Sequence, residues 1–218
     1  MMRRRRGVPV RVLFGVLFPL PSSGAEGGSS NYFPGAVGTF APAHEKPKGL
    51  TLSSMALFTA TEVDRAELQG RLNVSVDTLA VLDNLTALWT FDAEILGATP
   101  SIGLTLPLGW AEARTSLRPA GSPTPTSRFE DDTFAVGDLA AMPISLGWVF
   151  DELDLYLSLS QIVVMPTGEY DTDNLINLSR NHWSFDTLLA TTWLSDTTGT
   201  EISVVHGLMG NTENPKTD

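Results

Sequence analysis

Apolar and small polar residues alternate along most of this chain, and this alternation constrains the fold more than any other feature. In residues 96–110 the apolar residues take the even positions, while Thr99 and Ser101 are among the small residues at odd positions. The same alternation returns in residues 153–160 and 201–208. Because successive side chains of a strand point to opposite faces, each segment is predicted to be a β-strand with one apolar face. The helical period fits these segments less well.

This pattern predicts an all-β fold, an antiparallel up-and-down meander that forms part of a β-barrel. Its seven predicted strands span residues 50–62, 71–91, 94–112, 133–150, 153–165, 182–194 and 200–210. The partial barrel domain is therefore placed at residues 50–218. Residues 26–49 are rich in Gly and Pro and are predicted to be an irregular plug or cover segment.

The phase of the alternation changes once, within residues 71–91. Apolar residues stand at even positions up to Val76 and at odd positions from Leu85 onward. One extra residue in a strand would produce this change, so we expect a β-bulge within residues 77–83. Pro107 and Pro143 interrupt other strands, which favours barrel rims or bulges there.

Short turns and long loops are expected to alternate. Three strand ends share the pattern Trp-x-x-Asp, which predicts hairpin turns at residues 92–93, 151–152 and 196–199. Residues 117–133 and 166–181 are long and polar, as are the external loops of outer-membrane barrels. The five tryptophans fall near strand ends and are candidates for an aromatic girdle, or alternatively for caps of a sandwich core. They are Trp89, Trp110, Trp148, Trp183 and Trp193.

The first 25 residues have the three regions of an export signal. Four arginines at positions 3–6 precede a short apolar stretch at residues 12–20, and Ser23-Gly24-Ala25 ends in small residues. We expect cleavage after Ala25. A wrongly chosen start codon is the alternative.

Charge and composition exclude several classes of function. The chain has 25 acidic and 14 basic residues, and five of the basic residues lie in the first eleven positions. A body this acidic repels phosphate backbones, so a nucleic-acid partner is not expected. Without cysteine there is no disulfide or thiol nucleophile. The longest apolar run is too short for a membrane-spanning helix, whereas a barrel needs no such run.

No catalytic constellation is visible among the few candidates, so we expect neither an enzyme nor a cofactor. His182 and Asp186 are too far apart on a strand for direct contact. The acidic residues of 169–174 lack the Gly and terminal Glu of an EF-hand loop, so a solvated loop is favoured over a calcium site.

Small and polar residues opposite the apolar face are the candidate lining of a lumen. They are Arg71, Asn73, Ser75, Asp77, Thr99, Ser101, Thr105, Asp154, Tyr156, Ser158, Ser160, Glu201 and Ser203. The sequence does not distinguish an open conduit from a filled barrel interior.

Several segments together resemble one known family. They include Pro166-Thr167-Gly168-Glu169-Tyr170-Asp171, Gly137-Asp138-Leu139, and the opening run at residues 26–35. The most specific runs contain Asn181, Trp183, Ser184, Phe185 and Asp186, followed by Asn211, Glu213, Asn214 and Pro215. These residues resemble the "MetA-pathway of phenol degradation" family.

The resemblance implies an outer-membrane β-barrel of a Gram-negative bacterium that takes up small hydrophobic or aromatic compounds passively. Outer-membrane lipid and small hydrophobic molecules would be its partners, with the barrel-assembly machinery during biogenesis. Such barrels have roughly twelve strands with an even count, so the resemblance also predicts that these 218 residues are a fragment. The alternatives are a secreted or periplasmic β-sandwich or lipocalin-like binding module, or a structural envelope protein without transport.

Overall fold

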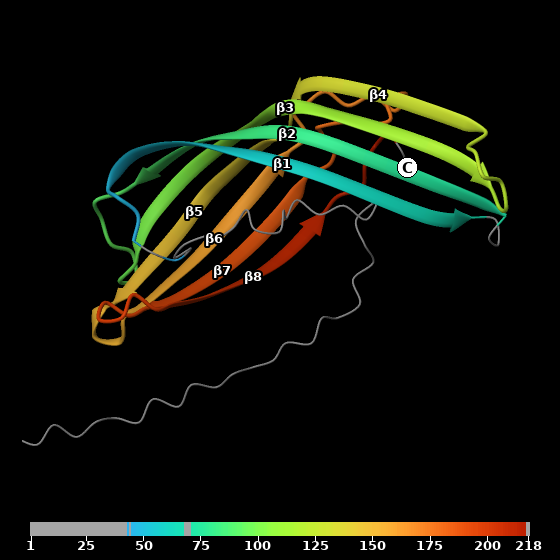
Figure 1. The fold of residues 1–218 in the computed structure, drawn as a ribbon. Coiled ribbons are helices and arrows are strands. Elements are labelled where there is room, and N and C mark those ends of the chain that lie inside the picture. Colours follow the sequence, from blue (N-terminus) through green and yellow to red (C-terminus); the bar gives the residue numbers. More distant parts are fainter. Residues whose placement is uncertain (1–42, 44, 68–70, 217–218) are drawn as a thin grey trace, which may run out of the picture. The chain divides into compact units, whose positions relative to one another are not determined.

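The computed structural model describes residues 43, 45–67 and 71–216, which belong to one compact unit. These residues form one antiparallel sheet of eight strands with a short 3-10 helix (Figure 1). The strands are β1 (Gly49–Glu67), β2 (Leu72–Thr90), β3 (Thr99–Pro119), β4 (Ser127–Val136), β5 (Leu139–Phe150), β6 (Leu155–Met165), β7 (Ser184–Leu194) and β8 (Glu201–Asn211), and the helix is η2 (Asp151–Leu153). The all-β antiparallel prediction is confirmed. The expected export signal, the opening run at residues 26–35 and residues 36–42 and 44 of the expected plug lie outside the described residues.

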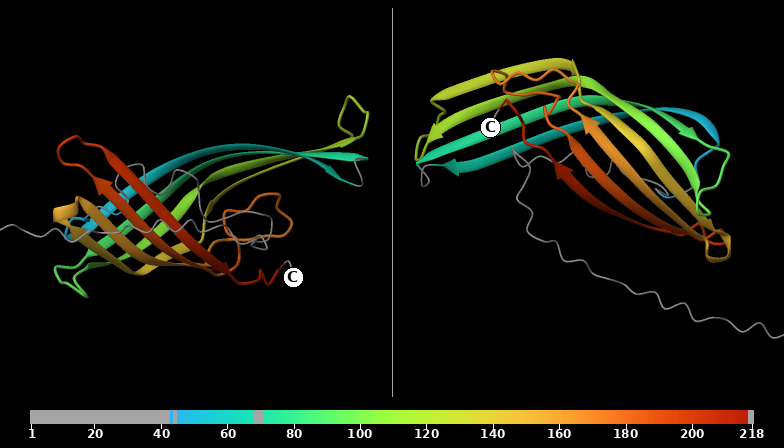
Figure 2. Two further views of the ribbon diagram at one scale, coloured as in Figure 1. Left: turned by 90° about the horizontal axis from the view of Figure 1, so that it is seen from below. Right: turned by 180° about the vertical axis from the view of Figure 1, so that it is seen from behind.

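The sheet follows the chain in the order β1-β2-β3-β5-β6-β7-β8, and β4 also pairs with β3. β3 is long enough to have two neighbours along one edge. Its first half pairs with β5 from Thr99 to Thr105, and its second half pairs with β4 from Leu108 to Leu117. The sheet therefore curves as a half-barrel at the level of β5–β8, while β1–β4 continue beyond it (Figures 1 and 2).

The predicted single strand at residues 133–150 is wrong, because β4 ends at Val136 and β5 begins at Leu139. The interruption lies beside Pro107 of β3, which has no N–H to donate to a neighbouring strand. Only its carbonyl takes part, accepting a hydrogen bond from the Gly137 amide at 2.8 Å. β4 also begins at Ser127, inside the expected loop at residues 117–133, so the real connection is residues 120–126.

The bulge expected in residues 77–83 is wrong. β2 pairs with β1 and with β3 residue by residue along its whole length, without a shift in register. The irregularity in the sheet lies instead in β5, between Ala141 and Ile144, where Pro143 was expected to disturb the strand. The phase change along β2 is therefore a change in which face of the sheet is apolar.

The three short hairpins predicted from the Trp-x-x-Asp pattern are present as the β2–β3, β5–β6 and β7–β8 connections. The first turn lies later than predicted, at Leu96 and Gly97, which both have positive φ angles of 53° and 73°. Ile95 and Ala98 on either side exchange two backbone hydrogen bonds of 2.9 Å. Two successive residues with positive φ are the geometry of a tight turn that matches the twist of a hairpin.

The two faces of the sheet differ in burial. We call the face that carries Thr90 and Ser101 the inner face, since these residues are only 1% and 3% exposed. The opposite, outer face carries Trp89 and Ile102 and is more exposed. A β-sandwich would place a second sheet on the apolar outer face, whereas the described residues form a single sheet.

Candidate functional site

The outer face of β1–β3 carries an apolar band that the strand register assembles row by row. One end of the band is the row of Leu50, Trp89 and Ile102. The other end is an aromatic row formed by Phe58, Val81, Trp110 and Phe134. Between these rows on the three strands, the polar outer residues are Ser54 and Asp83, and Ser54 Oγ donates a hydrogen bond to Asp83 Oδ1 at 2.8 Å. Leu52 and Phe58 are 72% and 76% exposed.

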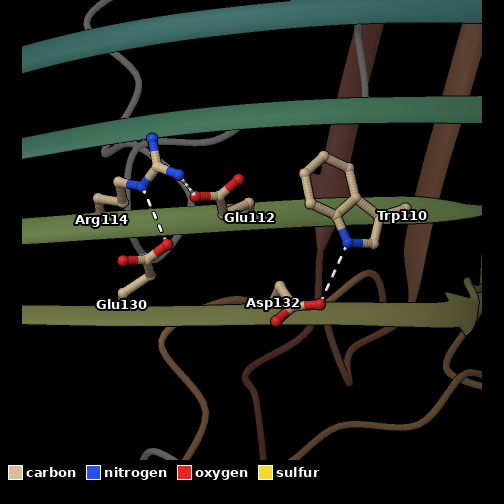
Figure 3. A network of polar contacts seen from close by, with 5 residues as sticks. All are labelled: Trp110, Glu112, Arg114, Glu130 and Asp132. Carbon is tan, nitrogen blue, oxygen red and sulfur yellow. Dashed lines mark hydrogen bonds and ion pairs between the residues drawn. The ribbon is translucent and has the colours of Figure 1, made fainter.

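Beyond the aromatic row the outer face becomes charged, in the next row on β3 and β4 and one row later on β1 and β2, after Ala60 and Leu79. Trp110 Nε1 donates to Asp132 Oδ2 at 3.2 Å (Figure 3). Arg114 donates from Nε to Glu130 at 3.1 Å and forms an ion pair with Glu112. We call this part of β1–β4, beyond the aromatic row, the extension. The indole thus lies between apolar and charged surface, as expected for Trp at an interface.

The apolar outer face continues over β5–β8. Leu146, Leu159 and Leu189 form one row there, and Ile202 and Leu208 of β8 are 60% and 80% exposed. The outer faces of all these strands therefore form one apolar surface at the same level as the band.

The candidate girdle tryptophans all lie on or at the edge of this apolar surface. Trp89, Trp148 and Trp193 are outer-face residues near the three short turns. Trp148 Nε1 donates to the Leu96 carbonyl at 3.1 Å, and so connects two of these turns. On the opposite side of the apolar surface are Trp110, in the middle of β3, and Trp183, directly before β7. The Trp183 ring stacks on outer-face Phe185, with ring centroids 6.4 Å apart.

The inner face carries a row of small hydroxyl residues that crosses four strands. The row is Thr90, Ser101, Ser145 and Ser160. Ser160 Oγ donates to Ser145 Oγ at 2.8 Å, and Thr90 Oγ1 donates to Ser101 Oγ at 3.5 Å. Elsewhere on this face Thr86 and Thr105 are 2.9 Å apart, as are Thr192 and Ser203. The hydroxyls therefore hydrogen-bond to one another across neighbouring strands.

Most of the candidate lumen residues are brought together on this inner face. They are Thr99, Ser101, Thr105, Tyr156, Ser158, Ser160, Glu201 and Ser203. The placement of Asn73, Ser75 and Asp77 on the same face is wrong, because β2 has no bulge and these residues share the outer face with Trp89. Arg71 precedes β2, and Asp154 lies in the β5–β6 turn with a φ of 52°.

A short segment before β1, which is part of the predicted plug or cover at residues 26–49, lies against the inner face. The Ala43 amide donates to Thr192 Oγ1 of β7 at 3.4 Å, and Lys46 Nζ donates to Ser145 Oγ of β5 at 3.1 Å. Lys48 pairs with Asp92 after β2. Burial lowers the pKa of Lys46 from its usual value. The alternation of the strands contains no signal for these contacts, since the segment lies outside them.

At the other end of the inner face, Asp138 organises the connection between β6 and β7. Its carboxylate accepts hydrogen bonds from the Gly168 amide, Ser179 Oγ and the Arg180 amide at 3.0, 2.7 and 2.8 Å. Asp138 is 7% exposed. Sequence reasoning noted Gly137-Asp138 as part of a motif but assigned it no role. The sequence feature that could have indicated this role is Gly137-Asp138 before β5, since Gly and Asp favour turns.

The structure also brings the two family runs together. Asn181 Nδ2 donates to Asn214 Oδ1 at 2.7 Å, and the Trp183 amide donates to Thr212 Oγ1 at 3.0 Å. Ser184 pairs with Asn211 at the start of the β7–β8 ladder. The runs are thus neighbours across two strand ends. Glu213 and Pro215 lie in the same connection after β8.

The remaining candidates form no catalytic or metal cluster. His182 Nδ1 lies 3.4 Å from Ser184 Oγ, and Asp171 Oδ1 accepts the Asp173 amide at 3.0 Å within its own loop. Among the described residues, no group of three or more His, Asp or Glu side chains is placed to hold a metal ion. No helix in this part of the chain is long and apolar enough to cross a membrane.

The fold and its two faces define a partial β-barrel with an apolar outer band and a small, polar inner wall. The family model described as "Putative MetA-pathway of phenol degradation" matches residues 63–218. The chain belongs to this family, as the sequence runs indicate. No curated protein and no solved structure matches the chain.

Proposed function

We propose that this chain forms part of the wall of an outer-membrane β-barrel through which small hydrophobic, including aromatic, compounds enter passively. The observation that carries the proposal is the apolar band, beyond which the outer face becomes charged in all four strands within two register rows, at Glu112 and Asp132 and then at Glu62 and Asp77. A buried interface with another soluble domain would not need such a level boundary between aromatic and charged rows.

The height of the band supports contact with lipid. On β1 it runs from Leu50 to Phe58, which is about 27 Å along a strand at ~3.4 Å per residue. A strand tilt of about 40° reduces this to roughly 20 Å along the membrane normal, close to the apolar height of outer-membrane barrels. Strands of 11 and 12 residues in β5–β8 are also sufficient to cross.

The inner wall supports neutral cargo. Its hydroxyl rows offer weak, uncharged contacts, so a small solute is not held tightly. Asp186 and Glu201 point to the same face and disfavour anions. The aromatic class of the cargo rests on the family, which is described by a phenol-degradation pathway. The proposed passage is passive and includes no catalytic step or cofactor.

Orientation follows from the longest connection between the described strands, residues 166–183, which lies at the same ends of the strands as residues 120–126. We propose that residues 120–126 and 166–183 face the outside of the cell, with the three short hairpins in the periplasm. Protease added to intact cells should then cut in residues 120–126. Cutting only after the outer membrane is permeabilised would contradict this orientation.

The function is tested by phenol uptake at limiting concentration in cells that do or do not express the gene. Faster uptake with the gene supports the proposal. A heat-modifiable gel shift and partition into detergent should accompany it, whereas a soluble binding module would show neither. Equal uptake by inserted protein would reject transport.

A structural envelope role is the second candidate, and one observation favours it. Residues 43 and 45–48 cover part of the inner hydroxyl wall, so the interior is partly filled at the short-turn end. Equal phenol uptake together with a weakened envelope in a deletion strain would support this candidate instead.

A further inference from the structure

The connection between β6 and β7, residues 166–183, folds back onto the inner face of the extension. The Leu175 amide donates to Asp131 Oδ2 at 2.8 Å. Asp131 pairs with Ala113 and shares its inner face. Ala111 and Ala113 are 3% and 2% exposed there. Figure 2 shows this connection beside the sheet rather than extended away from the strand ends.

Asp138 holds both ends of the connection to the sheet. Gly168 lies near its start and Ser179 and Arg180 near its end, and all three donate to the one carboxylate. Hydrogen bonds to an ionised, buried acceptor are about twice as strong as neutral ones. The Leu139 amide adds a fourth contact to Thr167 Oγ1 at 2.9 Å.

Close packing at Gly168 shows that this docking is specific. A Cβ on Gly168 would lie 2.8 Å from the Val136 carbonyl oxygen and 2.9 Å from the backbone of Gly137. The connection therefore approaches the end of β4 more closely than any side chain allows.

A second fastening joins the connection to the segment after β8. Lys216 Nζ donates to the Tyr170 carbonyl at 2.7 Å and lies 5.7 Å from the centre of the Tyr170 ring. Together with the Asn181–Asn214 bond, it joins both ends of the connection to the segment after β8.

We propose that residues 166–183 are a fixed constriction, held by Asp138, that sets the upper size limit of the solutes that pass. This inference rests on the proposed function. A polar connection of this length would lose less conformational entropy if it stayed solvated. Its multiple fastenings against the inner face instead reduce the free width of the interior at this level. Asp138 is thus a positioning residue for specificity.

The test compares uptake of phenol and 1-naphthol, which share a hydroxyl group and differ in ring size. Asp138→Ala should raise the ratio of 1-naphthol to phenol uptake about tenfold, because the buried carboxylate no longer holds the connection inward. Asp173→Ala removes the same charge from an exposed position of the same connection and should leave the ratio unchanged. The heat-modifiable gel shift reports whether each variant is folded.

A disulfide provides the converse variant, because the chain has no cysteine. Asp131→Cys with Leu175→Cys, oxidised in the Asp138→Ala background, should return the ratio to the wild-type value, and reduction should raise it again. A folded Asp138→Ala protein with the wild-type ratio would overturn the constriction and leave transport standing. Wild-type cells that take up phenol no faster than cells without the gene would overturn both.

Discussion

The apolar band and the extension are built from the same strands and yet have opposite faces. In the band the outer face is apolar and the inner face carries hydroxyls such as Thr90 and Ser101. In the extension the order is reversed. Its outer row is Glu62, Asp77, Arg114 and Glu130, and the inner row beneath it is Val63, Val76, Thr115 and Phe129.

No irregularity in β2 separates the two regions, because its pairing with both neighbours is continuous. The reversal therefore reflects a change of surroundings along a regular strand. Under the proposed function, lipid favours apolar side chains on the outer face at one level, and water favours charged ones at the next. A sheet that crosses such a boundary changes its apolar face without changing its geometry.

A charge placed in the middle of the band tests the comparison most severely. Leu106→Arg lies on the outer face in the central row of the band, and should cost about 2–4 kcal/mol of stability in a bilayer. Ser116→Arg lies on the same face of β3 in the extension and should be tolerated. Urea unfolding of the protein in lipid vesicles measures both. Equal tolerance of the two arginines would show that the band does not contact lipid.

Gly109 lies where the band meets the extension, and its replacement tests whether β2 and β3 must approach closely at this point. A Cβ there would lie 2.2 Å from the Val81 carbonyl oxygen and 2.8 Å from Leu82 Cα. Gly109→Ala should cost about 1–3 kcal/mol through this overpacking. Gly147→Ala is the control, since its Cβ would meet nothing nearer than Thr99 at 3.8 Å. Matching midpoints of urea unfolding would contradict the expected crowding.

The hydroxyl wall of the band is expected to give a smaller effect. Ser145→Ala removes the partner of both Ser160 and Lys46 at a position that is 1% exposed. The loss should be about 1 kcal/mol, because the two donors can find other partners only in part. Ser53→Ala, at an exposed position of the same face, serves as the control. A neutral Ser145→Ala would mean that the row does not stabilise the wall.

The charged row of the extension should give the smallest effect. Glu130→Met breaks the exposed contact with Arg114, in which the two side chains are 65% and 61% exposed. Solvent and salt screen such pairs, so we expect no resolvable change in the unfolding midpoint at physiological salt. Repeating the measurement at low salt should reveal a small difference. A large loss at physiological salt would mean that this surface is not solvated.

Sequence alone predicted the strands well where alternation is strict. Ile202 and Val204 lie on one face of β8 and Glu201 and Ser203 on the other, as expected. This success has a local cause, since the period of two depends only on the geometry of a single strand. The Trp-x-x-Asp hairpins succeed for the same reason, apart from the shifted turn at Leu96.

Predictions that depend on a distant partner were less successful. Asn73, Ser75 and Asp77 were assigned to the inner face because a bulge in residues 77–83 was expected to keep one face of β2 apolar along its whole length, and the register of β2 has no such bulge. The break beside Asp138 was missed because it depends on Pro107, which lies about thirty residues earlier and pairs only after folding. The contact of Lys46 with Ser145 likewise joins residues far apart in sequence.

The sequence by itself determined that the chain is an antiparallel sheet with one apolar and one polar face, and that it belongs to its family. These properties depend on side-chain type and spacing, which the amino-acid sequence gives directly. Only the tertiary structure decided at which level the faces exchange character, and that residues 166–183 lie on the inner face. Those properties depend on strand register and on buried hydrogen bonds of Asp138, and both exist only once distant segments have paired.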